Sequence, residues 1–393
     1  MSSGPQVLVA GVSAENEVSG GRDAMMDVEE GLSTQIEGQS SASTIPGSAG
    51  GGGHRQDADV QMGDASTVAG SISDNDSAIG GVGSYAYVFM NPHNRFLILG
   101  SSFLNEIVEE NGRTYHVYKD GKYMLPNDEV ELNRLDMQNK MWSITLDQKL
   151  HLAPIGSNPQ NVLDIATGTG IWAIDFADNY PSAHVIGTDL SAIQPASIPS
   201  NLTFELDDAE DDWIFPQKFD YIHGRTLATC FKSPLSVFKK AYEALAPGGW
   251  FEMQDMCLQR SDDGSMDGTS LKEWQEHVQK ATAFTGVPWT NVPNYKRWFI
   301  EAGFEDVTEV TFRWPSNQWS GNRKERLLGA WTQAQIDNGM LESVSTRLFM
   351  MKLGWSQEKL DEFLAKVNAD TKNPNIHAYS PVTVVYGRKP GSS

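Results

Sequence analysis

Short apolar runs alternate with amphipathic stretches through the last two thirds of the chain. The run Asn161-Val162-Leu163-Asp164-Ile165 ends in a glycine-rich turn, and residues at helical spacing follow over 171–179. This alternation of strand and helix signals indicates an α/β fold with a parallel, doubly wound sheet. Strands are predicted over 161–165, 183–188, 201–206, 219–223, 250–257, 306–314 and 382–388. Helices are predicted over 128–150, 171–179, 234–245, 271–284, 294–302, 323–337, 341–353 and 357–369.

The first hundred residues differ in composition from the rest of the chain. They contain 17 of the 36 glycines, no lysine or tryptophan, and 12 acidic against 3 basic residues. Such a segment cannot bury enough apolar surface to offset the entropy of ordering it. We therefore predict a disordered, acidic, Gly/Ser-rich tail over 1–105 and a folded domain over 106–390. An apolar stretch at 86–100 interrupts the tail, and we interpret it as a translated intron or a partner-binding segment.

Composition argues against several classes of function. The 30 basic and 51 acidic residues give a net charge of −21, which disfavours direct binding of nucleic acid or of a membrane surface. Two cysteines, Cys230 and Cys257, do not make a disulfide framework, so we expect a reducing, intracellular setting, cytoplasmic or nuclear. We find no pattern of a signal peptide or a transmembrane helix. The eight histidines are scattered without ligand spacing, so no metal site is predicted.

The chemistry is concentrated where the predicted strands end. The loop 164–170, Asp-Ile-Ala-Thr-Gly-Thr-Gly, joins a strand to a helix. Its glycines, Gly168 and Gly170, allow the backbone to approach a ligand closely. Asp189 ends the second strand 19 residues beyond Gly170, the spacing at which a carboxylate accepts hydrogen bonds from ribose hydroxyls. This pattern predicts a cofactor that contains a nucleoside.

Two further acids indicate which nucleoside is bound. Asp208, followed by Ala209 after the third strand, is placed to accept a hydrogen bond from an adenine amino group. Asp164 stands where the pyrophosphate of a dinucleotide would lie, so it disfavours phosphate and favours a cation. S-adenosylmethionine carries both an ammonium and a sulfonium group. A nicotinamide oxidoreductase remains an alternative, because Gly168-x-Gly170-x-x-Ala173 also matches the dinucleotide pattern.

Three residues are candidates for a role in catalysis. Methyl transfer depends largely on proximity and orientation, and it needs a general base only for poorly ionised acceptors. His223 follows the fourth strand and is either such a base or a structural residue. Arg225, beside it, is a catalytic candidate or a group that holds a substrate carboxylate. Glu252 shares a face of the fifth strand with Gln254, and it either orients an acceptor or makes buried hydrogen bonds.

These motifs resemble those of the class I S-adenosylmethionine-dependent methyltransferases, in particular the fungal group similar to LaeA and to trans-aconitate methyltransferase. The resemblance covers about 109–390 and is carried by 111–116, 121–128, 150–154, 164–170, 187–191, 219–225 and 248–252. It implies a seven-stranded, Rossmann-like sheet with an N-terminal helical cap and extra C-terminal helices. It also implies that the last strand, 382–388, inserts antiparallel beside 306–314.

The resemblance also implies the residues that contact S-adenosyl-L-methionine. They are Asp164, Gly168, Gly170, Asp189, Leu190, Asp208 and Ala209. Tyr115, His116 and Tyr123 of the cap either close over the methionyl end of the cofactor or simply pack. Ala166 stands where many class I enzymes have a glycine, and a methyl-sized side chain can replace glycine there if the backbone torsions stay negative.

The domain and functional assignments follow from this resemblance. It divides the folded domain into a cap over 106–155, a cofactor-binding core over 156–260, and substrate-side helices with closing strands over 261–390. The predicted function is S-adenosylmethionine-dependent methylation of a small-molecule acceptor in fungal secondary metabolism. The alternative is a regulator of secondary-metabolite genes that is similar to LaeA and acts through protein partners, which the tail would contact.

Overall fold

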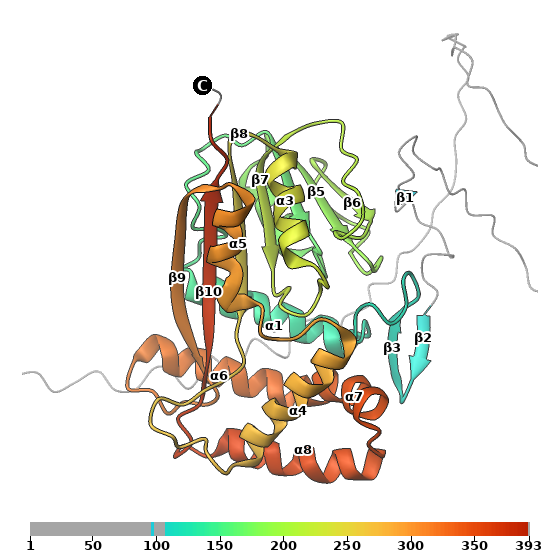
Figure 1. Ribbon diagram of the computed structural model, residues 1–393, viewed down its shortest axis with the longest axis vertical. Helices are drawn as coiled ribbons and strands as arrows, with labels where there is room; N and C mark the ends of the chain where they lie inside the picture. The colour runs from blue at the N-terminus through green and yellow to red at the C-terminus, as the bar shows by residue number, and fades with distance from the viewer. Residues whose placement is uncertain (1–95, 98–106, 392–393) are drawn as a thin grey trace, which may run out of the picture. The chain divides into compact units, whose positions relative to one another are not determined.

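A computed structural model describes residues 96–97 and 107–391 of the chain (Figure 1). Apart from residues 96–97, the predicted tail lies outside the described residues, as does most of the apolar stretch at 86–100. The described residues form one eight-stranded sheet, a separate two-stranded hairpin and eight α-helices. None of these helices is long and apolar enough to cross a bilayer.

The large sheet has the strand order β1-β6-β5-β4-β7-β8-β10-β9. Strands β4 to β8 pair in parallel, whereas β10 runs antiparallel between β8 and β9. This confirms the seven-stranded, Rossmann-like sheet with an inserted last strand, and the short β1 adds an antiparallel edge strand beside β6. The strands are β1 (Phe96–Leu97), β4 (Asn161–Ile165), β5 (His184–Asp189), β6 (Leu202–Leu206), β7 (Phe219–Arg225), β8 (Leu245–Met256), β9 (Glu305–Pro315) and β10 (Tyr379–Arg388).

Helices cover both faces of the parallel part of the sheet. Consecutive residues of a strand point to opposite faces, so Val162 packs with Trp172 of α2, while Leu163 packs with Phe238 of α3 and Phe299 of α5. A strand that is buried on both faces consists mostly of consecutive apolar residues, and for this reason β4 could be predicted from the sequence. The helices after the cap are α2 (Ile171–Asn179), α3 (Pro234–Ala244), α4 (Ser270–Thr285), η1 (Val292–Asn294, a 3₁₀ helix), α5 (Tyr295–Ala302), α6 (Arg323–Asp337), α7 (Met340–Leu353) and α8 (Gln357–Lys372).

The segment before β4 forms a cap from a hairpin and a helix. Strands β2 (Ile107–Glu110) and β3 (Arg113–His116) pair across the turn Asn111-Gly112, where φ is +52° and +72°. Asn-Gly favours this two-residue turn because both residues tolerate positive φ. This hairpin differs from the cap predicted from the sequence, which contained helix alone.

Helix α1 (Glu129–Thr145) follows the hairpin and is shorter than the predicted 128–150. It begins at Asp128, whose side chain accepts a hydrogen bond from the Glu131 backbone at 3.1 Å. It ends before Asp147 and Gln148, which have positive φ and cannot continue a right-handed helix.

The C-terminal helices form a second layer. Figure 1 shows α4, α6, α7 and α8 gathered beyond the end of the sheet at which α1 lies. Trp274 and Val278 of α4 pack there with Phe349 of α7 and Leu364 of α8. The cap and this helical layer therefore stand next to the carboxyl ends of the parallel strands, where a site of this fold class is expected.

Gly329 shows how closely α6 packs on the segment after β9. A Cβ atom at Gly329 would lie 2.0 Å from the backbone oxygen of Asn317. The Asn317 side chain donates hydrogen bonds to the carbonyl oxygens of Thr371 and Asn373 at the end of α8, so this segment is held in place. The close approach therefore requires glycine.

We predict that Gly329→Ala destabilises the protein, although alanine favours helix over glycine by about 1 kcal/mol in open positions. The expected loss is about 1–3 kcal/mol of unfolding free energy, the usual cost of overpacking. Denaturant unfolding of both variants measures it, with Gly321→Ala as the control, because no atom lies within 4 Å of a Cβ at Gly321. A Gly329→Ala protein as stable as the wild type would contradict the prediction.

Candidate active site

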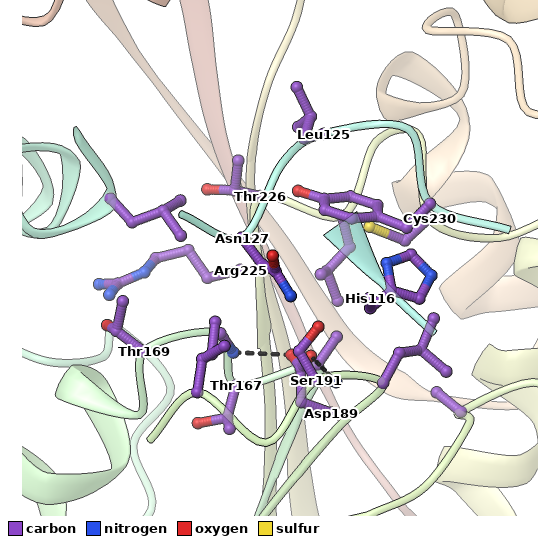
Figure 2. A pocket seen from close by; sticks show the side chains of 18 of the residues that line it. His116, Leu125, Asn127, Thr167, Thr169, Asp189, Ser191, Arg225, Thr226 and Cys230 are labelled. Atoms are coloured by element: carbon purple, nitrogen blue, oxygen red, sulfur yellow. Dashed lines mark hydrogen bonds between the residues drawn. The ribbon is translucent and has the colours of Figure 1, made fainter. Parts of the chain in front are cut away.

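A pocket lies between the carboxyl ends of the parallel strands and the cap (Figure 2). Because these strands all end at one edge of the sheet, the loops after β4, β5, β6 and β7 supply one wall. Strand β3, the loop after it and helix α1 supply the other wall. The lining includes 166–169, 189–191, 207–209 and 225–227 from the core, and 116, 122, 123, 125–127, 134, 135, 138 and 139 from the cap.

The loop after β4 turns sharply because three of its residues have positive φ. The angles are +61° at Gly168, +78° at Gly170 and +50° at Ala166. A Cβ atom at Gly170 would lie 2.3 Å from the ring of Phe204, so glycine alone fits there. The condition stated for Ala166, a negative φ, is not met. The chain turns directly out of β4, and alanine occupies the left-handed region at a cost of roughly 1–2 kcal/mol.

Asp189 lies at the end of β5 and lines the pocket. One carboxylate oxygen accepts a hydrogen bond from the Gly168 backbone N–H at 2.8 Å (Figure 2), and the other accepts from the Ser191 N–H at 2.8 Å. Burial raises the pKa of Asp189 to about 6, and these backbone donors oppose the rise. Each oxygen keeps a lone pair, so the carboxylate can still accept the two hydroxyls of a ribose.

Asp164 lies beneath the pocket rather than on its surface. Its side chain is 4% exposed and is not part of the lining. One oxygen accepts from Thr167 Oγ1 at 2.5 Å, and the other is 2.8 Å from His223 Nδ1. The His223 ring is fully buried and stacks on Trp172, with centroids 3.7 Å apart and planes 9° apart. Burial lowers the pKa of His223, so the ring is neutral at pH 7 and donates a hydrogen bond to Asp164.

Glu252 also lies outside the pocket. Its carboxylate is fully buried and accepts hydrogen bonds from the backbone N–H groups of Leu152 and Ala153, at 2.9 and 2.6 Å. The Gln254 amide donates a further bond at 2.7 Å. This carboxylate therefore holds the segment between cap and core against β8.

Asp208 lines the pocket, but cap lysines surround its carboxylate. Lys119 Nζ lies 2.6 Å from one carboxylate oxygen, and Lys122 forms an ion pair with the same oxygen. Lys122 also contacts Glu210 at 3.0 Å. The charges of the two lysines keep the pKa of Asp208 below its usual value despite burial. The ion pairs tie the cap to the loop after β6.

The structure brings some of the predicted site residues together and separates others. His116 and Tyr123 line the roof of the pocket, while Tyr115 packs under the Arg347 guanidinium at 4.3 Å from its ring centre. The predicted residues in the lining are Tyr123, Gly168, Asp189, Leu190, Asp208, Ala209 and Arg225. Those outside it are Asp164, Gly170, His223 and Glu252.

Helix α1 contributes residues to the pocket wall that were not predicted from the sequence. Arg134 and Gln138 are polar yet almost fully buried, and they stand one helical turn apart with Leu135 and Asn139 beside them. Polar residues one turn apart on a helix that precedes the first strand of the parallel sheet were a usable signal for this wall. Among residues 107–391, no three His, Cys, Asp or Glu side chains are grouped so that they could hold a metal ion.

Comparison with known proteins agrees with this fold and pocket. A family model described as a methyltransferase domain matches residues 137–309. The chain is 34% identical over 266 residues to the probable methyltransferase tdiE of Emericella nidulans, covering 67% of this chain and 83% of tdiE. It is 33% identical over 293 residues to the methyltransferase pytC of Aspergillus terreus, covering 74% of this chain and 90% of pytC. It is also 35% identical over 287 residues to the secondary metabolism regulator laeA of Aspergillus fumigatus, covering 72% of this chain and 76% of laeA.

A doubly wound sheet with an inserted antiparallel strand and an acid-lined pocket at its carboxyl edge defines a class I methyltransferase. The chain belongs to this family of S-adenosylmethionine-dependent methyltransferases, and its relatives include the fungal proteins tdiE, pytC and laeA. Its cofactor is S-adenosylmethionine, and the glycine loop and the two acceptor oxygens of Asp189 fit the nucleoside part of that molecule.

Glu252 makes stability depend on pH. Burial raises its pKa to about 7, so the folded state keeps a proton that the unfolded chain releases near pH 4. Stability from this group is therefore present below about pH 4 and is lost as the pH rises towards 7. Asp255, with its pKa raised to about 7 by burial, acts in the same direction.

We predict that Glu252→Gln flattens the fall in unfolding free energy between pH 4.5 and 7, by up to about 3 kcal/mol. The glutamine is accommodated because Oε1 of Gln254 has no partner and can accept from the new amide. Chemical denaturation across this pH range tests the prediction, and Glu362→Gln, on the exposed surface of α8, is the control. Identical pH slopes for wild type and Glu252→Gln would contradict it.

Proposed function

We propose that the chain transfers the methyl group of S-adenosylmethionine to a small-molecule acceptor, as part of fungal secondary metabolism in an intracellular setting. The observation that carries this proposal is the roof of the pocket. Residues of β3, the loop after it and α1 cover the carboxyl edge of the sheet. An acceptor that fits between this cap and the core can be enclosed, whereas the surface of a folded protein would need the cap to move aside.

We assign the nucleoside end of the pocket from the hydrogen-bond acceptors that line it. Asp189 would bind the ribose hydroxyls through the free lone pairs of its carboxylate. Leu190 and Ala209, which line the same end, would flank the adenine ring, and Asp208 would lie at its edge. Tyr123 would cover the cofactor from the cap.

We assign positioning roles to the residues beneath the pocket. Asp164 holds the Thr167 hydroxyl, and His223 holds Asp164, so together they fix the loop that carries Gly168. Gly170 permits the close approach of this loop to Phe204. Glu252 fixes the link between cap and core. His223 and Glu252 act here through the residues that they hold, because neither side chain faces the pocket.

Methyl transfer in such a site relies on orientation. When bound, S-adenosylmethionine supplies an electrophilic methyl group on a sulfonium. The chain's own residues then hold the nucleoside at Asp189, exclude water with the cap, and align the acceptor beside the end of β7. The cap over 106–155, the cofactor-binding core over 156–260 and the substrate-side segment over 261–390 would divide these tasks.

A second candidate is a regulator that acts through protein partners, and the similarity to laeA favours it. Methyl transfer to extracted metabolites and co-purification of partners, each with the full chain and with a chain lacking residues 1–100, would separate the two. Transfer to a metabolite that does not depend on residues 1–100 supports the small-molecule enzyme. Partner binding that needs these residues, without transfer to any metabolite, supports the regulator.

We predict that Asp189→Ala weakens binding of S-adenosylmethionine and S-adenosylhomocysteine at least tenfold. The variant loses charge-assisted hydrogen bonds that are worth about 1.5–3 kcal/mol. Isothermal titration calorimetry with both ligands measures the loss, with NADH as a third titrant. The exposed Asp361→Ala on α8 is the control and should bind as the wild type does.

Thermal unfolding of Asp189→Ala separates lost binding from lost structure. Unchanged affinity in a folded variant would remove Asp189 from the cofactor site. Binding of NADH by the wild-type protein, with no response to the two sulfur nucleosides, would overturn the assignment of the pocket.

A further inference from the structure

Three side chains with permanent positive charge line the pocket within the described residues: Lys122, Arg134 and Arg225. The first two are neutralised by carboxylates of the chain itself. Lys122 pairs with Asp208 and Glu210. Arg134 pairs with Glu131, with nitrogen–oxygen distances of 2.7 and 2.9 Å.

Arg225 differs from both, because no carboxylate of the described residues lies within 4.0 Å of its guanidinium. Its Nη2 donates one hydrogen bond of 2.7 Å to Oδ1 of Asn139. The amide of Asn139 also hydrogen-bonds to Asp175, so this neutral side chain bridges the arginine and the nearest acid of α2. Most of the five N–H donors of Arg225 are left for another partner.

Burial lowers the pKa of Arg225 to about 10, and the charges of Asp164 and Asp175 oppose this effect. The group therefore keeps its charge at pH 7, and its side chain is half-buried in the pocket wall. A ligand that covers the guanidinium removes this charge from water, which is costly unless the ligand brings an anion.

The sheet places Arg225 at the end of the pocket away from the nucleoside acceptors. The strand order β6-β5-β4-β7 puts Asp208 first, Asp189 next, then the glycine loop, and Arg225 last. In Figure 2, Arg225 lies on the side of Thr169, with Asp189 and Ser191 across the pocket. The reacting end of a cofactor whose ribose lies on Asp189 would point towards Arg225.

We propose that Arg225 is a carboxylate anchor at the methyl-transfer end of the pocket. This proposal rests on the proposed function, because it takes the nucleoside to lie over Asp189. The planar guanidinium fork matches a carboxylate through two parallel hydrogen bonds. The lining also contains Asp189, Asp207 and Asp208, so a group with one negative charge meets less repulsion than a phosphate with two.

The carboxylate can come from the amino-acid part of the cofactor or from the acceptor. Decarboxylated S-adenosylmethionine separates these sources, because it keeps the sulfonium and the ammonium and lacks only the carboxylate. Titration calorimetry of the full-length protein compares it with S-adenosylmethionine. The variants are Arg225→Gln, which removes the charge, and Arg225→Lys, which keeps the charge without the fork. Arg297→Gln, on the exposed surface of α5, is the control.

If the cofactor supplies the carboxylate, Arg225→Gln weakens S-adenosylmethionine binding about ten- to a hundredfold and leaves the decarboxylated ligand unchanged. If the acceptor supplies it, both ligands bind the variant as they bind the wild type. Saturation-transfer NMR on protein loaded with S-adenosylhomocysteine then detects benzoate or acetate binding that is present in the wild type and in Arg297→Gln and lost in Arg225→Gln. Either result supports the anchor.

Two results would overturn the proposal. One is an equal loss of affinity for both ligands in Arg225→Gln and Arg225→Lys, which would mean that the arginine only shapes the pocket. The other is unchanged affinity for both ligands without any carboxylate binding that depends on Arg225. If Arg225→Gln does not fold, Arg225→Lys provides the same comparison of the two ligands. A wild-type protein that binds neither S-adenosylmethionine nor S-adenosylhomocysteine would instead contradict the proposed function.

Discussion

The buried carboxylate of Asp164 is the contact on which the shape of the pocket depends. It receives the Thr167 hydroxyl from above and the His223 ring from the neighbouring strand, and Trp172 of α2 stacks on that ring. A charge buried to this degree is stable only when its hydrogen bonds are made. These bonds hold the loop after β4 in an otherwise unfavourable backbone conformation, in which Ala166 has a positive φ. The Gly168 N–H is then directed at Asp189, which sets the distance between two walls of the site.

Electrostatic contacts hold the cap over this loop on both sides. On the core side, Lys119 and Lys122 meet Asp208, and Lys119 also reaches Asp211 at 2.6 Å. On the side of the helical layer, Arg347 of α7 contacts Glu110 and Asp120 of the cap at 3.1 and 2.8 Å. In these pairs a buried group, Asp208 or Arg347, meets a more exposed partner, so each pair ties the cap to the core or to the helical layer.

The cationic side chains of the pocket fall into two kinds: those paired with acids of the chain and one that is not. Acids of the chain neutralise Lys122 and Arg134, so these cations belong to the architecture of the cap. Arg225 is held by the neutral amide of Asn139 and keeps its charge for a ligand. His223 and Glu252 look like catalytic groups in the sequence, yet His223 Nδ1 is bound to Asp164 and the Glu252 carboxylate to the backbone of 152–153. Neither side chain lines the pocket, so these contacts are structural.

The sequence by itself determined the class of fold and the positions along the chain at which a nucleoside site would form. The apolar runs of β4 and β5 and the glycines between them are local signals, and parallel strands always end at one edge of the sheet. The turn Asn111-Gly112 was also readable, although it was overlooked. Only the tertiary structure decided which polar groups face the pocket. Burial, the neighbouring strands and the cap determine which groups these are, because a side chain's partners can lie a hundred or more residues away in the chain, as Glu252 and Leu152 show.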